Sequence, residues 1–159
     1  MQRNSGSGSG NRSNPASRSY QTAEYLELVG PLDRDVFLQA VSSVLGNTES
    51  LNMHYRETAA GVFQEWCAKS NEPTIVDLSM SKDPESRALA WMEREREVAP
   101  VLGGALPYAS AIIVLGESRH FWYLRVHHIA LDGYGYWLVQ RAVAKRYRSM
   151  LDGTHRSAV

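Results

Sequence analysis

The chain has a single cysteine, Cys67, among its 159 residues, which excludes an internal disulfide and a C-x-x-C metal or redox motif. It also lacks net charge, because 17 Lys and Arg residues balance 17 Asp and Glu residues, so nothing favours binding to nucleic acid or to an anionic membrane. No apolar run approaches the roughly 18 residues of a membrane span, and the N-terminal region has no apolar signal segment. We therefore expect a cytoplasmic protein. No G-x-S-x-G motif marks a serine nucleophile.

The chain does contain enough apolar sequence for one domain, or for a fragment of a larger one. Hydrophobic residues make up 43% of it and charged residues 21%, which is typical of globular proteins. Residues 1–19 are mainly Ser, Gly, Asn and Arg, and we expect a disordered linker or vector-derived sequence there. The folded part is expected over residues 20–151, followed by a flexible tail over residues 152–159.

The spacing of apolar residues predicts a mixture of strands and helices in the folded part. Strands are expected at 20–29, 51–57, 62–68, 74–78, 105–115 and 120–129, and helices at 33–46, 84–98 and 134–151. The second and third strands should form a hairpin, and the two long apolar runs should form the centre of the sheet. This order favours an α+β fold, a two-layer sandwich with the helices on one face of a mixed β-sheet.

Two patterns indicate which helix faces meet solvent and which meet the core. The charged run at residues 93–97 is expected to be a solvated face with local ion pairs. In the last helix the apolar residues expected to face inward are Trp137, Leu138, Val143, Ala144 and Tyr147. Its basic residues should face solvent or, as an alternative, dock a carrier protein; they are Arg141, Lys145, Arg146 and Arg148.

The most informative segment is His127-His128-Ile129-Ala130-Leu131-Asp132-Gly133, in which two histidines end an apolar run. Successive side chains of a strand point to opposite faces, so only one imidazole can enter a given pocket, where it would be poised near neutral pH. The other must pack or hydrogen-bond. Alternation places His128 with Trp122, Leu124 and Val126, and places His127 with Phe121, Tyr123 and Arg125.

The residues after the histidines supply a charge and a small side chain. Asp132 can hold a loop by pairing with a nearby arginine, the candidates being Arg119, Arg125 and Arg141. Gly133 lets backbone or substrate approach closely. No metal site is expected, because adjacent strand histidines diverge and no third ligand has a recognisable spacing. The alternative to a functional site is a pair of histidines whose hydrogen-bonding groups all have partners, followed by an Asp-Gly turn.

The same segment, continued by Tyr134-Gly135-Tyr136, resembles the signature of condensation domains of nonribosomal peptide synthetases. The resemblance extends over residues 20–151, because residues 25–33 are similar to that family's first strand and its turn into a helix. Glu49-Ser50-Leu51 falls where the family has its R-H-E-x-L-R segment.

This resemblance implies one lobe of the two-lobed chloramphenicol acetyltransferase-like fold, in which a tunnel between the lobes brings two carrier-bound substrates together. It implies that His128 faces the reacting centre as the catalytic residue, that His127 and Asp132 support the site structurally, and that Gly133 lies close to the substrate. It also implies no directly bound cofactor, because the phosphopantetheine arms are carried by donor and acceptor peptidyl carrier proteins.

The chain departs from the family pattern in two respects. The family's S-x-A-Q-x-x-x-W motif is absent where the chain opens in linker, and the chain ends soon after the helix that follows the histidines, so we expect the N-terminal lobe without its C-terminal lobe. The last arginine of R-H-E-x-L-R is replaced by Asn52, which removes the expected partner of Asp132.

These observations leave three functions open. The first is a condensation lobe that forms amide bonds between two carrier-bound thioesters. The second is a coenzyme A- or carrier-dependent O-acyltransferase of the same superfamily. The third is a catalytically inert lobe that acts only in binding or association. A lone lobe exposes apolar surface, so homo-oligomers or aggregation are also expected.

Overall fold

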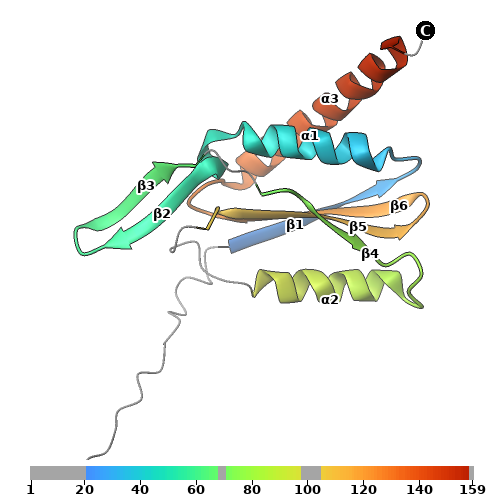
Figure 1. Cartoon of the computed structure of the whole chain (residues 1–159). Helices are drawn as coiled ribbons and strands as arrows, with labels where there is room; N and C mark the ends of the chain where they lie inside the picture. The colour runs from blue at the N-terminus through green and yellow to red at the C-terminus, as the bar shows by residue number, and fades with distance from the viewer. Residues whose placement is uncertain (1–20, 68–70, 98–104, 158–159) are drawn as a thin grey trace, which may run out of the picture.

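A four-stranded mixed sheet forms the centre of the molecule, which is described here by a computed structural model over residues 21–67, 71–97 and 105–157 (Figure 1). Its strand order is β1-β6-β5-β4, and it consists of β1 (Gln21–Val29), β4 (Thr74–Asp77), β5 (Tyr108–Gly116) and β6 (Arg119–His127). β6 pairs antiparallel with both β1 and β5, whereas β4 runs parallel to β5. The two long apolar strands therefore lie at the centre of the sheet, as predicted.

Two further strands form a separate hairpin, β2 (Met53–Thr58) and β3 (Gly61–Trp66), which projects from one end of the molecule (Figure 1). Gly61 follows the turn with a φ of 127°, a conformation that glycine adopts without steric cost. A short 3-10 helix, Glu49–Asn52, joins this hairpin to the preceding α-helix. The predicted hairpin is confirmed.

Within the described residues, three α-helices cover the sheet: α1 (Arg34–Gly46), α2 (Pro84–Arg96) and α3 (Gly133–Ser157). α1 and α2 begin at aspartate N-caps, because the carboxylates of Asp33 and Asp83 accept hydrogen bonds from the first-turn backbone N–H groups of Val36 and Ser86. α3 continues past its predicted end at Leu151 to Ser157, so a helix lies where the flexible tail was predicted to begin. The predicted linker at residues 1–19 lies outside the described residues.

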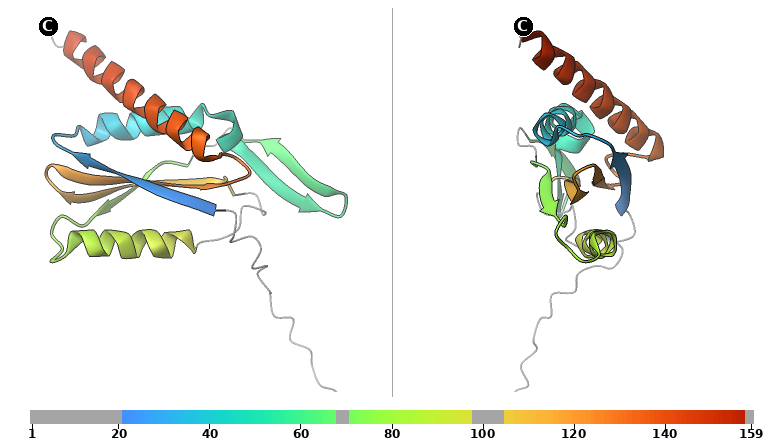
Figure 2. Two further views of the ribbon diagram at one scale, coloured as in Figure 1. Left: turned by 180° about the vertical axis from the view of Figure 1, so that it is seen from behind. Right: turned by 90° about the vertical axis from the view of Figure 1, so that its right-hand side faces the viewer.

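The helices do not share one face of the sheet. α1 and α3 pack on one face, and α2 packs on the other (Figures 1 and 2). The α+β class and the mixed sheet are confirmed, but the placement of every helix on a single face is wrong for α2, and the arrangement has three layers. The physical reason is that β5 and β6 are buried on both faces, so each face needs a helix to cover it.

Each face of the sheet has its own apolar cluster. On the α1 and α3 side the cluster includes Phe37 and Val41 of α1, and Tyr136, Val139 and Val143 of α3. On the α2 side, Ala88 and Met92 pack against Ala111, Ile113, Phe121 and Tyr123. Of the residues predicted to face inward on α3, Val143 is buried, whereas Trp137, Leu138 and Ala144 are exposed.

Candidate functional site

The histidine pair lies where β6 ends and the chain turns into α3. His127 is the last residue of the strand, and its backbone N–H donates to the Pro107 carbonyl at 2.8 Å. The chain then turns, because the Ala130 N–H donates back to the His127 carbonyl at 2.9 Å. His128 therefore lies beyond the strand, so strand alternation does not determine which face its side chain joins.

His128 is exposed, in contrast to the buried strand that leads to it. The preceding residues of β6, from His120 to Val126, are all buried, so the change in exposure occurs at the motif itself. His128 is thus not a member of the packed core. Its imidazole can reach a molecule that approaches this end of the sheet.

His127 is half-buried and belongs to the turn. Its Nδ1 accepts a hydrogen bond from the Ile129 N–H at 3.2 Å, so the neutral ring carries its proton on Nε2. Burial lowers the pKa of His127, and the neighbouring charges of His128 and Arg125 lower it further. The ring is therefore neutral near pH 7, which is the state that accepts from Ile129.

Asp132 forms the N-cap of α3. Its Oδ1 accepts from the Gly135 N–H at 2.8 Å, and its carbonyl accepts from the Tyr136 N–H at 3.1 Å. A carboxylate at this place also interacts favourably with the positive end of the helix dipole. Asp132 thereby fixes the direction in which the chain leaves the histidines.

The arginines considered as partners of Asp132 are engaged elsewhere. Arg119 pairs with Glu27 and Glu85, Arg125 pairs with Glu95, and the Arg141 guanidinium lies over the Trp137 ring at 5.2 Å from its centroid. Pairing of Asp132 with one of these arginines is therefore replaced by a backbone interaction. A helix start needs an acceptor for its free N–H groups, and an aspartate before glycine serves this need.

Asn52, at the place of the family's arginine, is buried and serves the end of α1. Its Nδ2 donates to the carbonyls of Leu45 at 2.8 Å, Gly46 at 3.1 Å and Thr48 at 2.8 Å. Leu45 and Gly46 are the last two residues of α1, where carbonyls have no partner further along the helix, and Thr48 follows just beyond it. The asparagine is thus a structural residue that joins α1 to the hairpin.

Gly133, the first residue of α3, is exposed and has open space around it. A Cβ added there would meet no heavy atom within 4 Å, and the φ of this glycine is not one that excludes other residues. Neither local packing nor backbone conformation therefore requires glycine at this position. The surface is open to an approaching molecule.

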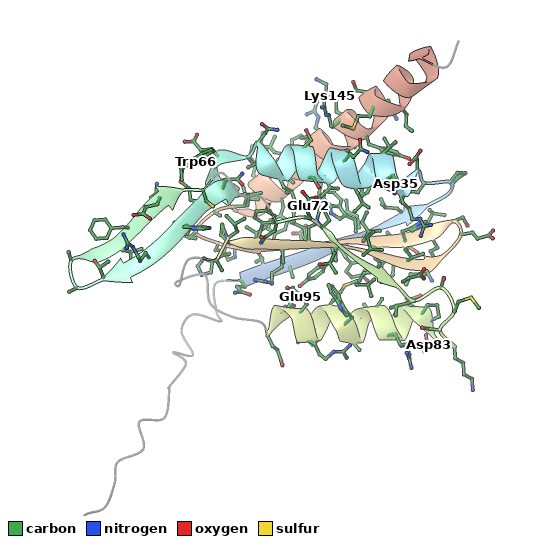
Figure 3. All side chains as sticks on the ribbon, in the orientation of Figure 1. Asp35, Trp66, Glu72, Asp83, Glu95 and Lys145 are labelled. Carbon is green, nitrogen blue, oxygen red and sulfur yellow. The ribbon has the colours of Figure 1, made fainter. Side chains whose placement is uncertain are left out.

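One buried polar network next to the motif was missed by the sequence reasoning. Glu95, expected on a solvated face, points toward the sheet and accepts hydrogen bonds from Arg125 and Tyr123 (Figure 3). The sequence did contain a sign of this network, because Arg125 lies in a largely apolar strand, and a buried guanidinium requires a carboxylate partner. Helical spacing also places Glu95 on the same face of α2 as Ala88 and Met92.

Described residues line three hollows of note, and the histidine motif lines none of these three. Their volumes are about 350, 390 and 220 Å³. The first lies at the opposite end of β6, where Arg34, Asp77 and the buried His120 line it. Near His128 the described surface instead carries exposed aromatic residues of α3, namely Tyr134 at 66% and Trp137 at 47% exposure, whose rings stack.

Two further properties concern membranes and metals. None of the helices in the described part of the chain combines the length and apolarity needed to cross a bilayer. Over the same ranges, no three His, Cys, Asp or Glu side chains gather in a way that could hold a metal ion.

The comparisons with known proteins all point to one family. Its family model, the condensation domain, matches residues 10–158, so the match begins inside the predicted linker. The chain is 35% identical over 140 residues to a dimodular nonribosomal peptide synthase of Bacillus subtilis (strain 168), covering 87% of this chain and 6% of that protein. It is 36% identical over 146 residues to an isonitrile lipopeptide synthase of Streptomyces coeruleorubidus, covering 91% and 10%.

Condensation domains also occur among the solved structures of similar fold. The starter condensation domain of rhizomide synthetase matches with a TM-score of 0.80 and 27% identity, over 87% of this chain and 35% of that one. The first condensation domain of the calcium-dependent antibiotic synthetase, in complex with a substrate analogue, matches with a TM-score of 0.77 and 33% identity, over 86% and 33%. This chain thus spans about a third of those domains.

Proposed function

The chain belongs to the condensation-domain family of nonribosomal peptide synthetases, and from that membership we propose that it supplies the histidine-bearing half of an amide-forming active site. The reaction joins an upstream acyl or peptidyl thioester to the amine of a downstream aminoacyl thioester. A carbon–nitrogen bond forms, the carbon–sulfur bond breaks, and the proton lost by the amine balances the one gained by the thiolate. The exposed imidazole of His128 at the end of a buried strand carries the proposal.

In this reaction His128 acts as the general base. An amine with a pKa of ~8 is only partly neutral at pH 7, and every attack on the thioester releases a proton. A neutral imidazole accepts that proton, and such a base typically contributes 10²–10⁴-fold to the rate. Holding two tethered substrates together lowers the activation barrier by up to roughly 7–11 kcal/mol. Substrate positioning therefore lowers the barrier more than proton transfer to the base does.

The neighbours of His128 have supporting roles. His127 stabilises the turn through Ile129, and Asp132 caps the helix that follows, so both hold His128 from either side along the chain. Gly133 leaves room for the substrate, in accord with the open space around it. None of these residues needs to touch the reacting atoms.

The partners proposed for this chain are two peptidyl carrier proteins, donor and acceptor, each with a substrate on a phosphopantetheine arm. No cofactor is proposed to bind the chain directly. We propose a second, C-terminal lobe to complete the tunnel, since the chain spans about a third of the condensation domains it matches. The cytoplasm, where such synthetases meet their aminoacyl substrates, is the proposed location.

The exposed apolar face of α3 supports the need for a second lobe. Tyr134, Trp137 and Leu138 lie on it, each more than 40% exposed, next to the histidine motif. Large contiguous apolar patches are typical of interaction surfaces. Without the second lobe the chain should self-associate, and light scattering that shows a monomer at high concentration would contradict this.

The proposed function is tested by reconstitution. The chain is mixed with a separately purified C-terminal lobe and with donor and acceptor carrier proteins loaded with a matched substrate pair, and the product on the acceptor is detected by intact-protein mass spectrometry. An amide product that requires both lobes supports the proposal. Transfer to a hydroxyl acceptor alone favours an O-acyltransferase, and no product in any combination favours an inert lobe; either result overturns it.

A further inference from the structure

A buried ion pair joins three elements of the fold just before the histidine motif. Arg125, 7% exposed, donates from Nε and Nη2 to the two carboxylate oxygens of Glu95 at 2.9 and 3.0 Å. Its Nη1 donates to the Gln21 Oε1 at 3.1 Å. The Tyr123 hydroxyl donates to the same carboxylate at 2.8 Å, and burial together with that carboxylate raises the pKa of Tyr123, so the phenol remains a donor. The guanidinium thus links β6 to α2 and to β1.

A matching arrangement lies at the other end of the same strand. Arg119 also bridges β1 and α2, through Glu27 and Glu85, but its side chain is 41% exposed. An ion pair in solvent contributes little to stability. A buried one seldom stabilises a fold more than apolar residues would, because both charges lose their hydration. Burial of the Arg125 pair is therefore not explained by stability alone.

The location of the buried pair supplies an explanation. Arg125 precedes His127 by two residues on β6, so the two side chains share a face of the strand. Gln21, which accepts from Arg125, is the residue of β1 that lies opposite His127 in the sheet. The pair therefore fixes the strand end on which the turn with His128 is built.

We propose that Arg125 and Glu95 are positioning residues, whose ion pair holds the end of β6 and the His127 turn in place and thereby positions His128. This proposal rests on the proposed function in that His128 is taken as the base. It extends the site from one segment of the chain to α2, which contributes no residue to the histidine motif.

The ion pair also acts on the charge state of His127. Among the described residues, the charged neighbours of this ring include Arg125 on β6 and His128 in the turn. The uncharged Gln21 lies opposite His127 on β1, and Glu95 of α2 balances Arg125. A protonated His127 cannot accept from the Ile129 N–H, so the turn requires the neutral ring. The positive charge of Arg125 favours that neutral form.

Because the two partners carry opposite charges, their removal has opposite effects on His127. Arg125→Met removes a positive charge and should raise the pKa of His127, whereas Glu95→Gln leaves Arg125 unbalanced and should lower it. Simple loss of structure would move both variants in the same direction, toward the value of an unfolded histidine. Opposite signs therefore show that the ion pair acts on His127 within a folded turn, whereas equal signs indicate loss of structure.

The experiment is an NMR titration of the imidazole resonances in the full chain between pH 5 and 8, with Arg119→Met as the matched control on the same strand. We expect the pKa of His127 to change by about 0.3–1 pH unit, upward in Arg125→Met and downward in Glu95→Gln. It should not change in the Arg119→Met control. Shifts of the same sign, or no shift in either variant, would overturn the proposal. The titration needs no substrate, so its failure is distinct from failure of the proposed function.

A second measurement uses the reconstituted two-lobed enzyme. The double variant Arg125→Met/Glu95→Leu replaces the ion pair with apolar residues and should retain the fold, as judged by circular dichroism. We expect its single-turnover rate to fall at least tenfold while that of Arg119→Met stays at the wild-type level. A folded double variant with the wild-type rate would refute the positioning role.

Discussion

Asn52→Ala should destabilise the fold more than any other exchange of an asparagine for alanine in the described chain. The Asn52 amide has two N–H donors shared among three carbonyls, so its loss removes the equivalent of about two hydrogen bonds at about 0.5–1.5 kcal/mol each. The side chain is buried, and the space it leaves adds to the cost. We expect a loss of about 2–3 kcal/mol in the free energy of unfolding.

Urea unfolding followed by circular dichroism measures this loss. With a slope of about 1–3 kcal/mol per molar urea, the midpoint should move by about 0.7–3 M. Asn47→Ala is the matched control, because the exposed Asn47 side chain at the same helix end donates one hydrogen bond, to the Ser43 carbonyl. Its effect should stay below about 1 kcal/mol. Equal midpoints for the two variants would refute the assignment of Asn52 as the residue that joins α1 to the hairpin.

Three further predictions concern the histidine motif and the core. Asp132→Ala and Asp33→Ala each remove a helix N-cap and should each lower the free energy of unfolding by about 1 kcal/mol, measured by heat or urea. Only Asp132→Ala should slow amide formation, and equal rates of amide formation in the two variants would contradict the role of Asp132 in the site. Gly133→Ala should leave stability unchanged or raise it by up to about 1 kcal/mol, yet lower kcat/KM in the reconstituted enzyme, and an unchanged kcat/KM would show that no substrate passes there. Burial, with a smaller contribution from Arg34, lowers the pKa of His120 below its ordinary 6.5, so the unfolded chain binds more protons than the folded one below that pH. The free energy of unfolding should therefore fall as the pH drops below 6.5, and urea titrations at stepped pH should show a shallower fall in His120→Phe; an equally steep fall would exclude His120 as the cause.

The elements were predictable where local signals agree. Asp33 and Asp83 cap helices close to the predicted starts of α1 and α2, and Gly61 follows the turn of the predicted hairpin. The long apolar runs of β5 and β6 identified the centre of the sheet. Because these runs are apolar at nearly every position, they also indicate strands that are buried on both faces of the sheet. This pattern predicts a helix on each face.

The errors arose where local sequence admits more than one solution. In α3 nearly every residue from Tyr134 to Val139 is apolar, so spacing alone did not determine which side faces inward, and Tyr136 rather than Trp137 is buried. The partner of Arg125 is distant in sequence, within a charged run that otherwise faces solvent. Helical spacing places Glu95 on the apolar face of α2, but only the tertiary fold brings that face against Arg125. Long-range pairings of this kind are decided by packing rather than by local pattern.

The catalytic assignment of His128 is tested most directly by single-turnover amide formation in the two-lobed enzyme, with His128→Ala compared with His54→Ala on the β2–β3 hairpin. We predict that His128→Ala slows the reaction by about 10²–10⁴-fold, with residual activity from substrate positioning, while His54→Ala retains the wild-type rate. A wild-type rate in folded His128→Ala would contradict the account.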